Sequence, residues 1–319
     1  MAGMAGDLTA LLAGSIDADR VRHDAALAPF TTFKVGGPAD WLVLAQRASE
    51  VKAALRAARE AGLPVTVLGG GSNTLVADGG VRGVVIRVHG GEVQPAGDGL
   101  VRADAGLTIN GLVRWTINRG VAGLEAWAGT PGTVGGAIYG NAHFKGRLVS
   151  ELVDSVEVVD PAGESGHEVR IAAADMEFGY DRSRLQRTRE LVLSADFRVG
   201  RGEPAALRAV ARDSLAYRKR TQPLESASAG CIFQNPDPAV DRVPAGIPAS
   251  AGALVDRAGL KGSREGAARV SPTHGNFIVN EGGASADDIR RLIDRCREHV
   301  RAQFDVELRD EIVYLGFGP

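Results

Sequence analysis

Hydrophobic positions recur at helical spacing in several stretches of the chain, most clearly at 285–304. There the apolar side chains are three or four residues apart and fall on one face of a predicted helix. Ser285 is expected to cap this helix, with Asp288 at its third position, as in a capping box. The apolar face holds Ile289, Leu292, Ile293, Cys296, Val300 and Phe304, so Cys296 is expected to be a core residue.

Three further helices are predicted from the same kind of spacing. The first is capped by Ser49 and ended by Gly62, the second lies at 106–120, and the third lies at 204–220. Short apolar runs predict strands at 64–68, 82–88, 153–160 and 190–199. The mixture of helices and strands indicates an α+β or α/β chain.

The length of 319 residues exceeds what one hydrophobic core usually supports. Breaks in the pattern near 91–99 and 199–204 divide the chain into three segments. We therefore expect domains at 1–95, 96–203 and 204–319, with 309–319 as a candidate addition to the first.

Charge and composition exclude several classes of function. A net charge of −2 argues against a broad nucleic-acid footprint. No run of about 18 apolar residues exists, so no membrane span is predicted, and residues 1–23 lack the features of a secretion signal. Two cysteines cannot form a disulfide framework, which fits a reducing cytoplasm. The six histidines show no metal-ligand spacing, so no metal site is predicted.

Two glycine clusters suggest a bound phosphate. "LGGGSN" (68–73) follows an apolar strand, and 123–141 reads as a second loop of the same character. Each could simply be a tight turn, but backbone amides in such loops can cradle an anion. Neither matches the nicotinamide fingerprint or a P-loop, so a flavin dinucleotide is favoured. The candidate cofactor-binding residues are Gly69, Gly70, Gly71, Ser72, Asn73, Gly129, Gly132, Thr133, Gly135 and Gly136.

Six motifs, in order, carry a resemblance to a known family. They are "TTFKVGGPAD", "VLGGGSNTLVADGGVRGVVIRV", "GLEAWAGTPGTVGGAIYGNA", "SAGCIFQNP", "AGLKGSREGAARVSPTHGNFIVN" and "LRDEIVYLG". Together they resemble UDP-N-acetylenolpyruvoylglucosamine reductase, the flavin-dependent reductase of bacterial peptidoglycan synthesis. The resemblance spans about 30–316. It implies an α+β fold: two FAD-binding subdomains of the vanillyl-alcohol-oxidase/PCMH type, here 1–95 and 96–203, and a third α/β substrate-binding domain at 204–319.

The resemblance also implies a reaction. NADPH reduces FAD, and the flavin reduces UDP-N-acetylglucosamine enolpyruvate to UDP-N-acetylmuramate. Hydride is added to C3 of the enol ether, and C2 is then protonated. We further expect a cytoplasmic monomer without a nucleic-acid or membrane partner.

Cys231 stands at the position where the family carries its proton donor, a serine or a cysteine. A thiol with an ordinary pKa of about 8.5 is mostly protonated at pH 7 and is a far stronger acid than a hydroxyl. The alternative for Cys231 is a small buried hydrophobe. Glu311 stands at the family's catalytic glutamate, and it helps a developing enolate only if it holds a proton. Its alternative is a surface glutamate beside Asp310.

The family's arginine is displaced in this chain. The family usually reads Tyr-Arg-x-Ser, whereas here the order is Tyr180, Asp181, Arg182, Ser183. We expect Arg182 to supply the guanidinium, with Arg184 as the fallback, and Tyr180 to contact substrate.

For the UDP diphosphate the resemblance points to Lys219 and Asn235. Because Arg218 and Arg220 flank Lys219, a solvated basic run is the alternative there. Val313 stands where many members have arginine. His274 lies in a matched motif but is expected to be structural, held by a backbone hydrogen bond.

Two alternative functions stay open at this point. One is a different oxidase or dehydrogenase of the same FAD-binding fold. The other is a non-catalytic nucleotide-binding relative, which only the displaced arginine supports.

Overall fold

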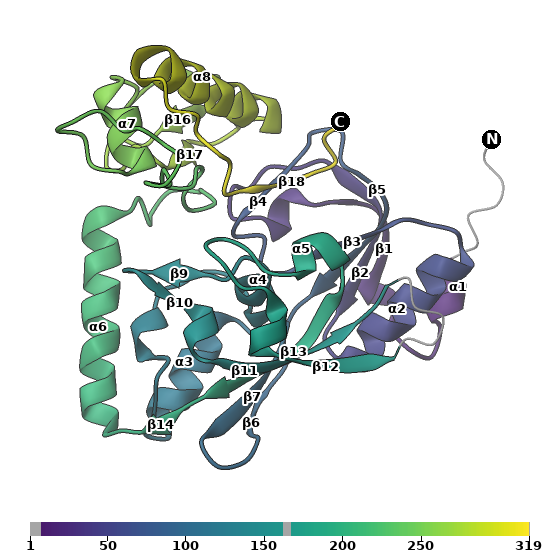
Figure 1. Cartoon of the computed structure of the whole chain (residues 1–319). Helices are drawn as coiled ribbons and strands as arrows, with labels where there is room; N and C mark the ends of the chain where they lie inside the picture. The colour runs from purple at the N-terminus through teal and green to yellow at the C-terminus, as the bar shows by residue number, and fades with distance from the viewer. Residues whose placement is uncertain (1–7, 162–166, 319) are drawn as a thin grey trace. The chain divides into compact units, whose positions relative to one another are not determined.

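The computed structural model describes residues 8–161 and 167–318 and groups the chain into two compact units (Figure 1). Unit 1 consists of 1–25, 39–70 and 82–216, and unit 2 of 26–38, 71–81 and 217–319. Residues 26–38 and 71–81 lie inside the expected segment 1–95 but group with the C-terminal part. Residues 1–7, part of the segment tested for a secretion signal, lie outside the described residues.

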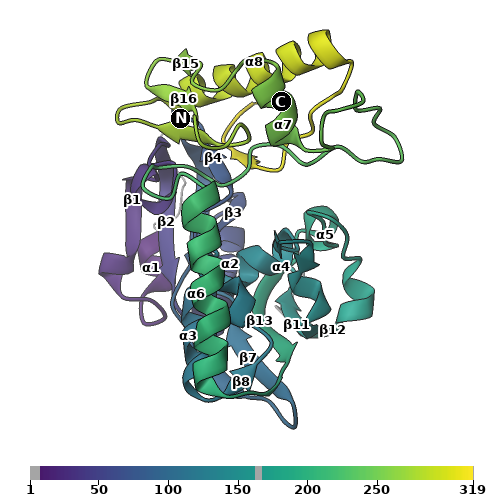
Figure 2. The same cartoon turned by 90° about the vertical axis from the view of Figure 1, so that its left-hand side faces the viewer.

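The change from one unit to the other near 216 falls inside a helix. Figure 2 shows this helix, α6 (Pro204–Thr221), along its full length. It starts at the proline after the predicted break, which suits the first turn because proline lacks an N–H that would be unsatisfied there anyway. The described residues contain no helix long and apolar enough to cross a bilayer.

Unit 1 contains two larger sheets. The first has the order β1 (Val21–Ala26), β2 (Pro38–Ala45), β5 (Val81–Val88), β3 (Val65–Leu68), with β3 parallel to β5. The second is antiparallel, in the order β12 (Glu168–Ala172), β11 (Val153–Val159), β13 (Leu191–Arg198), β7 (Leu100–Asp104), β6 (Val93–Pro95). All four predicted strands are therefore present. Two short pairs complete the unit: β9 (His143–Phe144) with β10 (Arg147–Leu148), and β8 (Val121–Ala122) with β14 (Gly200–Arg201).

The helices of unit 1 are α1 (Leu8–Leu12), α2 (Ala48–Glu60), α3 (Ile109–Asn118), α4 (Val134–Tyr139) and α5 (Leu185–Thr188). The expectation that Ser49 caps α2 is wrong, because the cap position is Arg47 and no side chain fills it. The Glu50 carboxylate instead binds the residue that precedes the cap position. It accepts a hydrogen bond of 2.7 Å from the Gln46 amide and is held by the Arg20 guanidinium at 2.8 and 2.9 Å.

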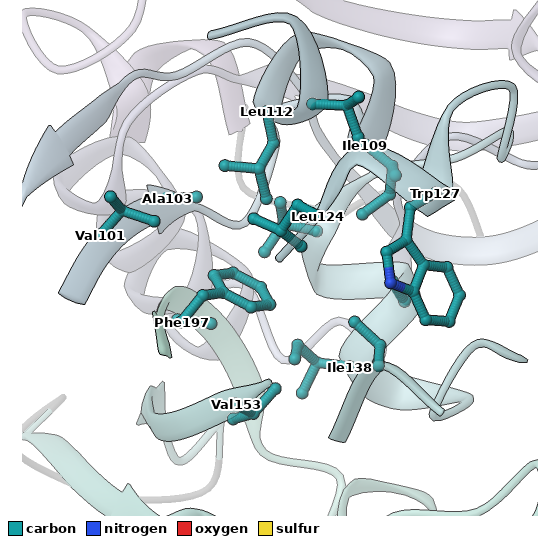
Figure 3. Packing of buried hydrophobic residues seen from close by; sticks show 14 of the residues in the cluster. Val101, Ala103, Ile109, Leu112, Leu124, Trp127, Ile138, Val153 and Phe197 are labelled. Atoms are coloured by element: carbon teal, nitrogen blue, oxygen red, sulfur yellow. The ribbon is translucent and has the colours of Figure 1, made fainter. Parts of the chain in front are cut away.

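The core beneath the antiparallel sheet fixes the position of α3 and α4. Figure 3 shows strand residues meeting side chains from both helices. Inward-facing positions alternate along β7, where Val101 and Ala103 are buried. The cluster drawn includes Val101, Ala103, Ile109, Leu112, Leu124, Trp127, Ile138, Val153 and Phe197. The glycine cluster at 123–141 therefore rests on a packed core.

Unit 2 has a small antiparallel sheet, β15 (Arg264–Glu265), β16 (Ala268–Val270) and β17 (Ile278–Asn280), with α7 (Ala251–Arg257) and α8 (Ala286–Phe304). A parallel pair joins β4 (Thr74–Val76) to β18 (Val313–Leu315). In both views α8 lies beside the small sheet (Figures 1 and 2). The hydrophobic core of unit 2 includes Phe33, Val35 and Leu75. This packing explains why residues 26–38 and 71–81 group with unit 2.

The predictions for α8 are confirmed. Ser285 accepts a hydrogen bond of 3.0 Å from the Asp288 amide, and the Asp288 carboxylate accepts one of 3.1 Å from the Ser285 amide. Cys296 is only 1% exposed, and burial raises the pKa of its thiol from 9.0 to about 12. This cysteine is a core residue.

Candidate active site

A short antiparallel pairing in unit 2 joins two of the expected catalytic segments. The Glu311 amide donates to the Ile232 carbonyl at 2.8 Å, and the Gln234 amide donates to the Arg309 carbonyl at 2.8 Å. Phe233 and Asp310 face each other between them. The backbones that carry Cys231 and Glu311 are therefore neighbours although 80 positions separate them in the sequence.

The Cys231 segment is fixed by a buried amide. The Asn276 side chain accepts from the Phe233 amide at 2.9 Å and donates to its carbonyl at 2.7 Å. On the other side, Gly230 has φ +79°, a conformation that favours glycine and that turns the chain just before the thiol. Cys231 itself is half-buried, unlike Cys296.

A buried guanidinium accompanies this thiol. Arg218, near the end of α6, is 5% exposed, and burial lowers its pKa to about 10, against an opposing effect of the charge on Cys231. Arg218 thus remains a cation at neutral pH. The alternative of a solvated basic run around Lys219 does not hold at Arg218, because this side chain is buried. Its helical spacing from the buried Leu207, Ala211 and Ser214 was the signal available.

Glu311 and its neighbour Asp310 have different partners. Asp310 accepts a hydrogen bond of 2.5 Å from Arg297, which also binds Asp294 at 2.5 Å. Glu311 is half-buried, and its carbonyl accepts from the Asn73 side chain at 2.9 Å. The Val313 amide donates to the Asn73 carbonyl at 3.0 Å, so Asn73 braces the backbone at Glu311.

In unit 1, the two glycine clusters meet backbone to backbone. A Cβ atom added at Gly70 would lie 2.7 Å from the Gly132 Cα, and one at Gly69 would lie 2.6 Å from the Thr133 Oγ1. Gly70 and Gly132 therefore meet main chain to main chain, and Gly69 faces the Thr133 hydroxyl; we call these four residues the glycine wall. The residues present fit a group that needs close backbone approach, such as a dinucleotide pyrophosphate.

The second cluster is only partly a loop. Thr133 caps α4 by accepting from the Gly136 amide at 3.4 Å, and Gly135 and Gly136 lie inside that helix. The expectation of a loop across 123–141 is therefore wrong from Val134 to Tyr139. Gly129 is held separately, because its amide donates to the Asn110 side chain at 2.7 Å.

Of the remaining cofactor candidates, Gly71, Ser72 and Asn73 belong to unit 2. Gly71 has φ +61°, and a Cβ atom there would lie 2.2 Å from the Phe30 carbonyl oxygen. Its own carbonyl accepts from the Thr32 amide at 3.0 Å. Glycine is required at 71 by the fold of this turn.

The displaced arginine lies in a tight turn of unit 1. Arg182 is exposed, and its guanidinium atoms lie 3.3 Å from the place of a Cβ atom at Gly179. The fallback, Arg184, is engaged by Glu190 at 3.0 and 3.1 Å. Tyr180 is 44% exposed. The Asp181 carboxylate contacts the imidazole of His143, which was not among the predicted site residues.

The two residues expected to bind the diphosphate differ in exposure and in their hydrogen bonds. Lys219 is exposed on α6, whereas the Asn235 side chain accepts from the Ala251 amide at 3.1 Å, at the first residue of α7. His274 accepts from the Asn276 amide at 3.2 Å through Nδ1, the backbone hydrogen bond expected for a structural histidine.

Two family models match this chain. An FAD binding domain matches 39–167, and the C-terminal domain of UDP-N-acetylenolpyruvoylglucosamine reductase matches 222–315. The reductase of Gloeobacter violaceus is 39% identical over 302 residues, covering 94% of this chain and 98% of that protein. The chain belongs to the UDP-N-acetylenolpyruvoylglucosamine reductase family. The family reductase of Bacillus velezensis is likewise 39% identical, over 93% of this chain and 94% of its own length.

A solved structure of the family reductase, from Thermus caldophilus, superposes with a TM-score of 0.75. It is 34% identical and covers 93% of this chain and 99% of that one. The expected fold class, an α+β FAD-binding fold with a family C-terminal domain, is confirmed. The glycine wall lies within the FAD-binding match and the Cys231–Glu311 pairing within the reductase match. Neither alternative function is favoured by these similarities.

Proposed function

We propose that this chain reduces UDP-N-acetylglucosamine enolpyruvate to UDP-N-acetylmuramate, using FAD and NADPH, in peptidoglycan precursor synthesis. The observation that carries the proposal is the pairing of the Cys231 and Glu311 segments inside the region that matches the reductase C-terminal domain. Binding alone would require neither a proton donor nor a half-buried carboxyl group on the backbone segment paired with it.

FAD, when bound, supplies the hydride that NADPH provides and that is added to C3 of the enol ether. Cys231 then delivers the proton from its Sγ to C2, and the double bond becomes a single bond. This step leaves a thiolate. The buried cation of Arg218 stabilises that thiolate as it forms, because an opposite charge nearby favours the ionised state.

Anion stabilisation falls to Glu311 and Arg182. A protonated Glu311 carboxyl donates to the enolate-like oxygen, whereas an ionised one would repel it. Arg182 provides a positive charge for the substrate carboxylate. Tyr180, Lys219 and Asn235 bind the rest of the substrate, with Lys219 as the point charge for the diphosphate. The glycine wall of unit 1 would hold the pyrophosphate of FAD, and Gly71, Ser72 and Asn73 follow it along the chain.

We further propose that the protein acts in the cytoplasm as a monomer, without a nucleic-acid or membrane partner. The net charge of −2 supports the absence of a nucleic-acid partner, and the low number of cysteines supports a reducing compartment. Segments 1–95 and 96–203 would hold the cofactor, and 204–319 the substrate.

Anaerobic stopped-flow absorbance of the flavin tests the function. Addition of NADPH should bleach the bound flavin, and UDP-N-acetylglucosamine enolpyruvate should then reoxidise it without oxygen. Bleaching without reoxidation would contradict the proposed substrate while leaving a flavoprotein. A protein that binds no FAD during reconstitution would contradict both.

A further inference from the structure

The turn that carries the displaced arginine is closely fixed. The Gly179 amide donates to the Arg182 carbonyl at 3.0 Å, and the Arg182 amide donates to the Gly179 carbonyl at 3.3 Å. Asp181 stands at its corner with φ +51°. The Asn141 side chain donates to the Gly179 carbonyl at 2.7 Å, which ties the turn to the segment after α4. The backbone position of Asp181 is therefore fixed.

The Asp181 side chain contacts a histidine. The Asp181 Oδ1 lies 3.0 Å from the His143 Nδ1, and the two side chains are 8% and 25% exposed. The imidazole also packs against the Tyr180 ring, with centroids 4.8 Å apart. Among the described residues, the buried Asp181 Oδ2 has no hydrogen-bond partner. A carboxylate so placed holds the imidazole with its Nδ1–H donating, and so leaves Nε2 for another partner.

An aspartate at this position creates an electrostatic problem that the histidine solves. The family's usual residue at the position of Asp181 is a cationic arginine, whereas a bare carboxylate would repel the carboxylate of the substrate. Protonated imidazole can donate from both nitrogens, one to Asp181 and one outward. Arg182, on the same turn, adds a second positive charge.

We propose that His143, positioned by Asp181, donates from Nε2 to the carboxylate of the enolpyruvyl substrate. His143 is then the catalytic donor that replaces the family's arginine side chain, and Asp181 is a positioning residue that acts through it. This inference rests on the proposed reductase function and names a further residue for it.

The test uses the FAD-bound enzyme and measures the two half-reactions separately. His143→Ala should slow reoxidation by the enolpyruvyl substrate about 100-fold, as for loss of one donor to a developing anion. Bleaching by NADPH should stay at the wild-type rate. The double variant Asp181→Arg, His143→Ala places a guanidinium at the family's position and should recover reoxidation to within about tenfold of wild type. His23→Ala, an exposed histidine of the same unit that packs on Trp41, is the matched control and should change neither rate.

Three results would overturn the proposal. The first is wild-type reoxidation in His143→Ala. The second is a folded, FAD-bound double variant as slow as the single one. The third is loss of FAD in His143→Ala, in the double variant and in the milder His143→Gln, which would give the pair a structural role. A wild-type enzyme that fails to reoxidise instead contradicts the proposed function, so the two failures are distinguishable.

Discussion

The two cysteines of unit 2 have the same side chain and opposite surroundings. Cys296 lies on the buried face of α8, where its neighbours are aliphatic and its pKa is raised to about 12 by burial. Cys231 is half-buried after a glycine turn, next to the Glu311 backbone and under the influence of the Arg218 cation. Residue type alone therefore does not decide what a thiol does. Access, a nearby charge and an adjacent acid separate the candidate proton donor from the core residue.

The largest expected effect is the removal of the Cys231 thiol. Cys231→Ala should slow reduction of the enolpyruvyl substrate by about 10³-fold or more, in the range of a lost general acid. Flavin reduction by NADPH should be unchanged. Cys231→Ser should keep much of the activity, because a hydroxyl occupies the same place. Single-turnover absorbance in both half-reactions measures this, and equal damage to both in the alanine variant would refute the proton-donor role.

Much of the difference between Cys231 and Cys296 could be predicted from the sequence, because its causes are local. The spacing of the apolar residues put Cys296 on the buried face of α8, and the capping box set where that helix starts. The roles of Cys231 and Glu311 were predicted from motifs that occur in the same order in the reductase family. The burial of Arg218 was not predicted, because a charged residue at the end of α6 is ordinarily expected to face solvent. Only tertiary packing buries it, on the same helix face as Leu207 and Ala211.

Long-range contacts explain the other gaps. His143 and Asp181 are 38 positions apart, and no spacing rule connects them. Likewise, Phe33 and Leu75 complete the core of unit 2 although they precede most of it by more than a hundred residues. Ser49 is not the cap because α2 already begins at Ala48, after Arg47, and no side chain caps it.

A smaller effect is expected from the cation near Cys231. Arg218→Met removes a buried guanidinium that helps the thiol release its proton, so reoxidation by the enolpyruvyl substrate should slow about tenfold. Alkylation of Cys231 by iodoacetamide should slow as well, because the thiolate is the reacting form. The exposed Arg220→Met, two positions along α6, is the matched control and should leave both rates unchanged. Equal effects of the two substitutions would remove Arg218 from the site.

The smallest effect concerns the core thiol and appears in stability alone. The pKa of Cys296 is about 12 in the folded chain against an ordinary 9.0, so above about pH 9 the unfolded chain releases this proton first. The unfolded state then binds fewer protons, and stability falls as pH rises. Cys296→Ala should cost about 1 kcal/mol at pH 8 through the lost side-chain volume, and it should leave both half-reactions intact. Between pH 8 and pH 10 the difference should move by about 1.4 kcal/mol in favour of the alanine variant, because alanine has no proton to lose, so the variant should become slightly the more stable protein at pH 10. Urea unfolding of both proteins at the two pH values measures this difference, in which the burial of Tyr314 acts equally on both chains. A difference that stays constant with pH would mean that the Cys296 thiol ionises as readily in the folded chain as in the unfolded one.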